Sequence, residues 1–344
     1  MKTIVYHEKD LENQEVLEHI HQVIKDEGLV VFPTETVYGI GANALNPNAA
    51  IKIYGVKGRP SDNPLIVHID HVDWLPDLAH HISSDARKLI QAFWPGPLTL
   101  VFQKNDIIPY EITGGLETVG IRYPAHPLAL KTIKAAQKPL SAPSANISGR
   151  PSSTTFEHVF EDLMGKVDII IDGGKSMIGL ESTVLDVTTP IPTILRPGFV
   201  SKHMIESILG YSILDVSETK LTDFPKSPGM KYTHYAPKGK ITVIDGDQKR
   251  VIDYINQTVQ QLKAIKTAVI CASEYVNQIQ CSNIIDLGSI DQPDVIASNL
   301  FMALRQMDDL EIEHIFTHTF SSEHIGSAIM NRLLKASGYN IISL

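Results

Sequence analysis

The order of predicted strands and helices changes at residues 210–239, and this change constrains the fold of the 344-residue chain more than any other feature. Over residues 1–209, several strand candidates follow one another with only loops between them, which predicts a mixed sheet. Over residues 240–344, short apolar strands alternate with helices, which predicts a small parallel sheet wrapped by helices. The stretch between them includes DFPKSPGMKYTHYAPKG, which is rich in proline, glycine and aromatic residues and has no clear periodicity. We therefore expect an α/β protein with domains at 1–209 and 240–344, joined by a linker over 210–239.

The composition agrees with two separate cores, because 43% of the residues are hydrophobic and 20% are charged. The net charge of −9 argues against a broad basic surface for nucleic acid. No apolar run is long enough to span a membrane, and the start of the chain becomes charged too early for a signal peptide. Cys271 and Cys281 have neither redox nor zinc spacing. We expect a cytoplasmic protein with two structural thiols and no membrane partner.

Residues 57–69, KGRPSDNPLIVHI, place two cations before a buried strand. Lys57 and Arg59 are two residues apart, so on an extended loop they point the same way, and Pro60 favours that geometry. Two adjacent cations repel each other unless an anion lies between them, and a triphosphate is a natural anion for this pair. The alternative is an ordinary pair of surface cations. His68, in the apolar strand that follows, is more typical of a core histidine than of a catalytic one.

Residues 33–44, PTETVYGIGANA, contain a loose match to a dinucleotide-binding glycine pattern. The match is incomplete because PTETVY stands between the preceding strand and the first glycine. We interpret the stretch as a polar shelf, in which Thr34 and Thr36 offer hydroxyl groups and the glycines allow close approach. A helix start capped by either threonine, with Glu35 in the first turn, is the alternative.

Further polar residues stand at predicted strand ends. Arg122 leaves a buried strand and therefore needs a carboxylate or a phosphate, and Ser182 and Arg196 lie at other strand ends. The loop SAPSANISGRPSS offers hydroxyl groups that either bind an anion or cap turns. In the second domain, His314 and His318 fall in a predicted strand, where a spacing of four places them on one face but far apart. A structural role is therefore favoured for both.

Taken in order, the motifs PTETVYGIG, KGRPSDNPLIVHI, WPGPLTLV, GIRYPAHP, SAPSANISGRPS, ESTVLDV and LRPG resemble those of the threonylcarbamoyl-AMP synthase (YrdC-like) family. The resemblance covers about the first two hundred residues and extends through SPGMKYTHYAP, which is similar to the linker of the longer two-domain form. It implies a twisted, open, mixed sheet with a large cavity, followed by a small Rossmann-like parallel domain.

The resemblance also implies an activity. Such enzymes are nucleotidyltransferases that convert L-threonine, bicarbonate and ATP into threonylcarbamoyl-AMP and pyrophosphate. The product serves threonylcarbamoyladenosine formation beside the anticodon of tRNA, through downstream threonylcarbamoyl-transfer proteins. Mg2+ is expected, held mainly through the ATP phosphates.

Individual residues acquire roles from the same resemblance. Lys57 and Arg59 resemble catalytic ligands of the triphosphate. The residues implied for ATP are Lys57, Arg59, Asn63, Thr118, Ser144, Asn146, Ser152, Arg196 and Tyr235. Those implied for L-threonine are Thr34, Thr36, His68, Arg122, Ala142 and Ser182. Arg122 is expected to pair with the amino-acid carboxylate, and Tyr235 to close the cavity.

Two other functions compete with this interpretation, and a third has weaker support. An RNA-binding module could use the same concave sheet, but the net charge and the scarcity of aromatic residues among the cations argue against more than weak binding. A carbamoyl-transferring relative would carry zinc-finger cysteines, and the sequence lacks that pattern. A dinucleotide oxidoreductase would depend on the incomplete glycine match alone.

Overall fold

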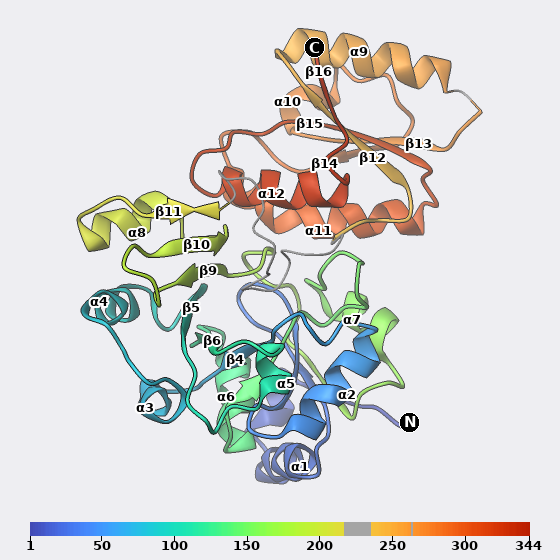
Figure 1. Cartoon of the computed structure of the whole chain (residues 1–344). Coiled ribbons are helices and arrows are strands. Elements are labelled where there is room, and N and C mark those ends of the chain that lie inside the picture. Colours follow the sequence, from blue (N-terminus) through green and yellow to red (C-terminus); the bar gives the residue numbers. More distant parts are fainter. Residues whose placement is uncertain (217–234, 263) are drawn as a thin grey trace. The chain divides into compact units, whose positions relative to one another are not determined.

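The computed structural model describes residues 1–216, 235–262 and 264–344 of the chain (Figure 1). It divides into two compact units. The N-terminal unit comprises Met1–Ser148, Ser152–Met177 and Glu181–Lys231, and the C-terminal unit comprises the rest, including the short segments Gly149–Pro151 and Ile178–Leu180. Residues 217–234 of the predicted linker lie outside the described residues, so the boundaries of that linker stay a prediction.

The N-terminal unit is built on an 11-stranded sheet with the order β1-β8-β2-β3-β7-β4-β6-β5-β9-β10-β11. It contains both parallel and antiparallel pairs, which confirms the predicted mixed sheet. The strands are β1 (Ile4–His7), β2 (Val30–Phe32), β3 (Gly39–Asn43), β4 (Ile66–His68), β5 (Leu98–Gln103), β6 (Thr118–Arg122), β7 (Leu140–Ser141), β8 (Ile169–Asp172), β9 (Thr183–Asp186), β10 (Thr193–Arg196) and β11 (Leu214–Asp215).

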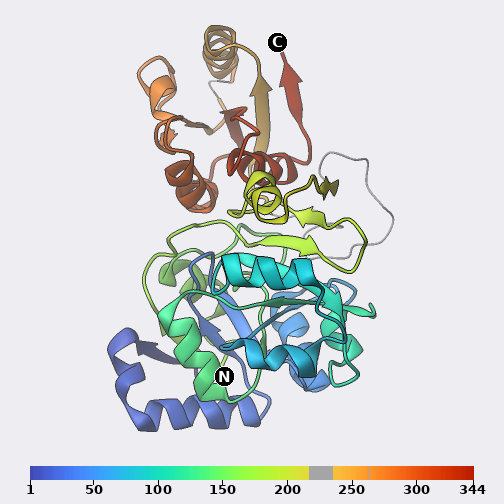
Figure 2. The ribbon, with the colours of Figure 1, turned by 90° about the vertical axis from the view of Figure 1, so that its left-hand side faces the viewer.

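The main helices of this unit are α1 (Gln14–Lys25), α2 (Pro47–Lys57), α4 (Ser84–Phe93), α6 (Pro127–Ala136), α7 (Phe156–Leu163) and α8 (Lys202–Leu209), with shorter turns at α3 (Leu75–Leu78), α5 (Tyr110–Thr113), η1 (Glu8–Glu12) and η2 (Val72–Trp74). Helices α1 and α6 lie side by side (Figure 2) and bury their apolar faces on one face of the sheet, against β2 and β8. A larger apolar core fills the opposite face, which carries Val31, Val67, Leu100 and Ile121. The strands thus present different chemistry on their two faces, as alternation requires.

The C-terminal unit contains a five-stranded sheet with the order β14-β13-β15-β12-β16, in which every pair is parallel. Its elements are β12 (Lys240–Asp245), α9 (Gln248–Gln261), β13 (Thr267–Cys271), α10 (Ser273–Val276), β14 (Ile284–Asp286), α11 (Pro293–Asp309), β15 (His314–His318), α12 (Gly326–Ala336) and β16 (Ile341–Ser343). The crossovers through α9 and α11 run in opposite directions along the sheet, and right-handed connections place these helices on opposite faces. The predicted parallel α/β domain is confirmed.

Two strands were not expected from the sequence, the two-residue β11, which lies in the predicted linker, and β3. Residues Gly39–Asn43 form β3, which pairs antiparallel with both β2 and β7. The glycines serve this pairing, because a Cβ at Gly41 would lie 2.6 Å from the ring of Phe32. The stretch therefore forms neither a helix start nor a dinucleotide-binding turn, and both alternatives are wrong.

Candidate active site

Strand β6 shows how the sheet separates its core from a polar face. Val119 and Ile121 point into the large apolar core, whereas Thr118, Gly120 and Arg122 alternate onto the other face. Gly120 has no side chain to cover this second face and remains partly exposed. This polar face continues along the sheet to β7 and β2, where α1 and α6 cover it.

Strand register brings predicted site residues together on this polar face. His68 of β4 pairs with Arg122 of β6, and Thr99 of β5 pairs with Arg122 from the other side. Ala142 follows β7 and donates its backbone N–H to the carbonyl oxygen of Ile66 at 2.9 Å, one strand away. Residues far apart in the sequence thus become direct neighbours on one face.

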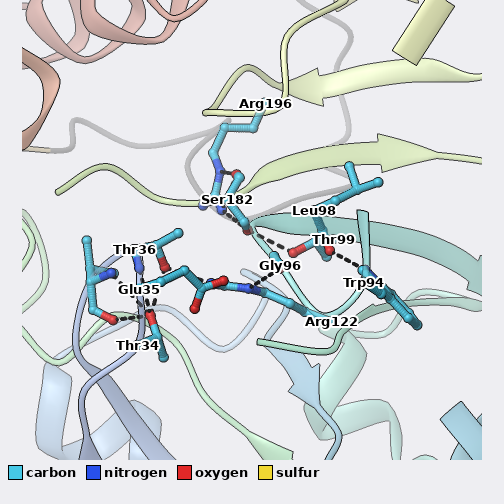
Figure 3. Close-up of polar contacts among 11 residues, drawn as sticks. Thr34, Glu35, Thr36, Trp94, Gly96, Leu98, Thr99, Arg122, Ser182 and Arg196 are labelled. Carbon is cyan, nitrogen blue, oxygen red and sulfur yellow. Dashed lines mark hydrogen bonds and ion pairs between the residues drawn. The ribbon is translucent and has the colours of Figure 1, made fainter. Parts of the chain in front are cut away.

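Arg122 is the centre of a buried polar cluster (Figure 3). Its Nη1 donates to Thr36 Oγ1 at 2.9 Å, and its Nε donates to the carbonyl oxygen of Gly96 at 3.3 Å. Its Nη2 lies 2.7 Å from Glu35 Oε1, and the two side chains are each only 5% exposed. We expected the amino-acid carboxylate to pair with Arg122, and in this structure an internal carboxylate already lies beside the guanidinium group.

The loop between β2 and β3 presents Glu35 and Thr36 to Arg122. The Thr34 hydroxyl holds this loop, because it donates to the carbonyl oxygen of Val37 at 2.6 Å and accepts from the backbone N–H groups of Thr36 and Val37, both at 3.2 Å. With the only hydroxyl hydrogen of Thr34 used, Thr36 donates to Thr34 Oγ1 at 2.8 Å. The chain of hydrogen bonds from Arg122 through both threonines fixes the polar shelf.

His68 lies beside this cluster and is 3% exposed. Burial, together with the positive charge of Arg122, lowers the pKa of His68 to about 3, while a hydrogen bond with the carbonyl oxygen of Ile66 acts in the opposite direction. The imidazole is therefore neutral near pH 7. Its Nδ1 lies 3.2 Å from that carbonyl oxygen, and its Nε2 has no hydrogen-bond partner in the part of the chain that the structure describes.

Ser182 and Arg196 form the next group along the face, where β9 begins and β10 ends. Arg196 donates through Nε and Nη2 to the carbonyl oxygen of Ser182, at 3.2 and 2.9 Å, and also from Nη2 to Ser182 Oγ at 3.2 Å. The Ser182 hydroxyl lies 2.8 Å from Thr99 Oγ1. Arg196, which is predicted to bind ATP, thus holds Ser182, which is predicted to bind L-threonine.

Lys57 connects the end of α2 to the loop SAPSANISGRPSS. It is the last residue of α2 and not part of an extended loop, so the geometry expected for Lys57 and Arg59 is wrong, and Gly58 ends the helix with φ 61°. Lys57 is 1% exposed, and its Nζ donates to the carbonyl oxygens of Ser144 and Asn146. The ammonium group therefore holds the backbone of the loop that carries two predicted nucleotide ligands.

Arg59 and Asn63 form a compact turn before β4. Arg59 donates from Nε to the carbonyl oxygen of Asn63 at 3.3 Å and from Nη2 to that of Pro64 at 3.1 Å. Asn63 is 2% exposed, and its Oδ1 accepts no hydrogen bond from the described residues. The turn therefore holds a polar amide oxygen that the described protein does not satisfy.

Both segments of the chain match known protein-family models. Residues 22–198 match the model Sua5_yciO_yrdC, described as telomere recombination, and residues 200–338 match the model described as threonylcarbamoyl-AMP synthase, C-terminal domain. The chain is 46% identical to the threonylcarbamoyl-AMP synthase of Pyrococcus abyssi, over 93% of this chain and 94% of that protein. It is 44% identical to the threonylcarbamoyl-AMP synthase of Bacillus subtilis, over 93% of this chain and 92% of that protein. The chain belongs to the threonylcarbamoyl-AMP synthase family.

The solved structures agree with this family. The crystal structure of P. abyssi Sua5 complexed with L-threonine matches the chain with a TM-score of 0.93 at 44% sequence identity, and the match covers 100% of both chains. The two-domain form of the threonylcarbamoyl-AMP synthase family, expected from the sequence, is therefore confirmed.

The other three predicted ATP residues, Thr118, Ser152 and Tyr235, have different surroundings. Thr118 shares the face of Arg122 but begins the strand that Arg122 ends, about 13 Å along β6. Ser152 is buried, and its hydroxyl donates to Glu181 Oε1 at 2.5 Å. Tyr235 belongs to the C-terminal unit, where its ring stacks on Phe301 with centroids 5.1 Å apart. The roles of these residues in this threonylcarbamoyl-AMP synthase family member stay predictions.

The sequence reasoning missed two carboxylates of the site, Glu35 and Glu181. The sequence predicts Glu35 only as an acid in the first turn of a helix, and it predicts no role for Glu181. Both are buried, at 4% and 6% exposure. The available signal was their position inside the motifs PTET and GLEST, where a carboxylate stands next to hydroxyl groups.

Neither a metal cluster nor a membrane span was found in the described parts of the chain. Among the residues that the structure describes, no group of three or more His, Cys, Asp or Glu side chains could hold a metal ion. No described helix is both long and apolar enough to cross a membrane.

Proposed function

We propose that this chain is an L-threonylcarbamoyladenylate synthase, which converts L-threonine, bicarbonate and ATP into threonylcarbamoyl-AMP, pyrophosphate and water. The observation that carries the proposal is the match to threonylcarbamoyl-AMP synthases at 44–46% identity over 93% of the chain, through both domains. The polar face of the N-terminal sheet supplies the corresponding site.

One end of this face suits an amino acid. The guanidinium group of Arg122 is suited to a carboxylate, and Thr36 and Ser182 offer hydroxyl groups near it. Neutral His68 provides a ring nitrogen that can share a hydrogen bond with the substrate hydroxyl. The P. abyssi relative with the same two domains has been solved in complex with L-threonine, which supports this placement.

The C-terminal end of α2 and the loops beside it, here called the nucleotide end, suit a triphosphate. Lys57 and the loop that carries Ser144 and Asn146 are joined by hydrogen bonds, and Arg59 lies on the adjoining turn. In the proposed reaction, the threonine nitrogen bonds to the carbon of bicarbonate with loss of water. An oxygen of the resulting carbamate then bonds to the α-phosphorus as the bond to pyrophosphate breaks. The cations hold the reacting groups in line and stabilise the negative charge that develops on the phosphate oxygens.

Mg2+ belongs to the proposal because bound Mg2+ would neutralise charge on the ATP phosphates. Since the described residues contain no metal-binding cluster, we propose that Mg2+ enters with the nucleotide. Location in the cytoplasm, transfer of the product by tRNA threonylcarbamoyl-transfer proteins and weak RNA binding remain predictions from the sequence.

Pyrophosphate release by the purified full-length chain tests the proposal. With ATP and Mg2+ present, L-threonine and bicarbonate are added singly and together, and we expect release only when both are present. Lys57→Ala should abolish this release because it removes a buried cation from the nucleotide end. Lys88→Ala is the control, since Lys88 is exposed on α4 and contacts Asp85. Release that is indifferent to threonine would reject the proposed function.

A further inference from the structure

We infer that Glu35 determines specificity in the amino-acid pocket, where its carboxylate receives the amino group of the substrate. This inference rests on the proposed function and adds a recognition residue to it. Glu35 is 4% exposed on the loop between β2 and β3 and contacts Arg122.

The carboxylate of Glu35 is poorly satisfied by the protein. Oε1 lies 2.7 Å from Arg122 Nη2, but the N–H directions do not meet it, and neither oxygen accepts a hydrogen bond from any residue that the structure describes. An ionised carboxylate can accept about four hydrogen bonds, and a buried one is costly unless they are made. Donors from a bound ligand would complete the site.

Other carboxylates in this unit accept hydrogen bonds from the protein itself. Asp168 accepts the backbone N–H of Leu29 at 2.8 Å, and Glu181 accepts the Ser152 hydroxyl at 2.5 Å. Glu35 has no such donor, although the hydroxyl groups of Thr34 and Thr36 stand on either side of it in the sequence. Those hydroxyl groups are engaged with each other and with Arg122. The loop therefore leaves Glu35 available to a ligand.

Charge identifies the class of ligand. A negative carboxylate repels bicarbonate and phosphate, so its ligand must donate hydrogen bonds and preferably carry positive charge. A free α-amino acid carries an ammonium group and a carboxylate on the same carbon atom. The neighbouring guanidinium and carboxylate of Arg122 and Glu35 offer the opposite charges in matching order. The pair thus fits a zwitterion, with the ammonium group at Glu35 and the substrate carboxylate at Arg122.

Two ligands measured by calorimetry test this inference on the full-length chain. L-threonine carries the α-amino group, whereas 3-hydroxybutyrate keeps the carboxylate and the hydroxyl group but lacks it. In Glu35→Gln we expect the Kd for L-threonine to rise on the order of 10- to 100-fold, while the Kd for 3-hydroxybutyrate stays the same or falls. Asp168→Asn, a carboxylate that accepts only a backbone N–H in the described structure, should change neither.

The ratio of the two Kd values decides the result, because a role through Arg122 alone would weaken both ligands alike. An equal loss for both ligands, or no change for either, would overturn the inference. Glu35→Asp keeps the charge and guards against misfolding of the Gln variant, and it should retain preference for the amine-bearing ligand. Wild-type protein that does not bind L-threonine would instead reject the proposed function.

Discussion

Two buried histidines, one in each sheet, are used in different ways. His68 ends β4 in the N-terminal unit and is 3% exposed, and His318 ends β15 in the C-terminal unit and is 2% exposed. Burial lowers the pKa of His68 to about 3 and that of His318 to about 4. His318 uses both ring nitrogens, because Nε2 accepts from the Ala272 N–H at 3.0 Å and Nδ1 lies 2.8 Å from the Thr319 carbonyl oxygen. Among the described residues, His68 has a partner at Nδ1 alone.

The surroundings of the two rings also differ, because His318 is packed between aromatic rings whereas His68 lies beside a charge. His318 stacks on Tyr275 with centroids 4.0 Å apart and also contacts the ring of Phe320 at 4.3 Å. His68 meets Phe32 edge-on at 6.4 Å and lies beside the charged Arg122. A buried polar group that the protein satisfies completely stabilises the fold, whereas one left incomplete beside a charge indicates a ligand site. The comparison therefore favours the N-terminal sheet as the place where a ligand binds.

The largest expected effect is that of Arg122→Gln. Loss of the guanidinium group removes the proposed receptor for the substrate carboxylate and leaves Glu35 buried without its cation. Truncating one partner of a buried charge pair costs about 2–5 kcal/mol, so we expect kcat/KM for L-threonine to fall at least 30-fold. Threonine-dependent pyrophosphate release at varied threonine measures this effect.

Lys104→Gln is the matched control for Arg122→Gln. Lys104 is also a buried cation of the N-terminal unit, but its Nζ donates to the carbonyl oxygen of Ile108 at 3.2 Å and lies over the ring of Tyr110. We expect little change in kcat/KM for this variant. Equal losses of kcat/KM in the two variants would contradict a specific role for Arg122, because a general effect of removing a buried charge would then explain both.

A smaller effect concerns the dependence of stability on pH. Unfolded histidine binds a proton below about pH 6.5, whereas His68 and His318 bind one in the folded state only near pH 3 and 4. Between these values the unfolded state holds more protons, so the free energy of unfolding falls as the pH falls. We expect a loss of about 2 kcal/mol per histidine between pH 7 and pH 5, measured by urea denaturation.

Variants separate the two contributions to this loss. His318→Gln should remove its share of the pH dependence and leave the KM for L-threonine unchanged. His68→Gln should remove a similar share and raise that KM. A His318→Gln variant with the full wild-type pH dependence would show that this histidine is not held neutral by burial.

Much of the fold could be predicted from the sequence because local patterns determine it. The apolar runs PLTLVFQ and TVGIRYP became β5 and β6, and the regular alternation after residue 240 became a parallel sheet. Strand β3 could not be predicted, since glycine disfavours strands and its use depends on the close packing of Phe32 against Gly41.

For the candidate site, the sequence predicted several of the residues that lie together, but not most of their contacts. His68, Arg122 and Ser182 do come together on one face, as their motifs suggested. Pro60 predicts an extended loop that includes Lys57, whereas Lys57 completes the last turn of α2. The pairing of Glu35 with Arg122 depends on register between distant strands, which no local pattern reveals.

The claim that the ligand site lies on the N-terminal sheet is tested most directly by nuclear magnetic resonance. The measurement observes the ring nitrogens in protein labelled with 15N-histidine. The signals of His68 and His318 can be assigned from His68→Gln and His318→Gln, and L-threonine is then titrated into the wild-type chain. We predict that the ring nitrogen signals of His68 move on titration and those of His318 do not. Movement of His318 alone, or no movement of His68 at saturating threonine, would contradict the assignment of the ligand site to the N-terminal sheet.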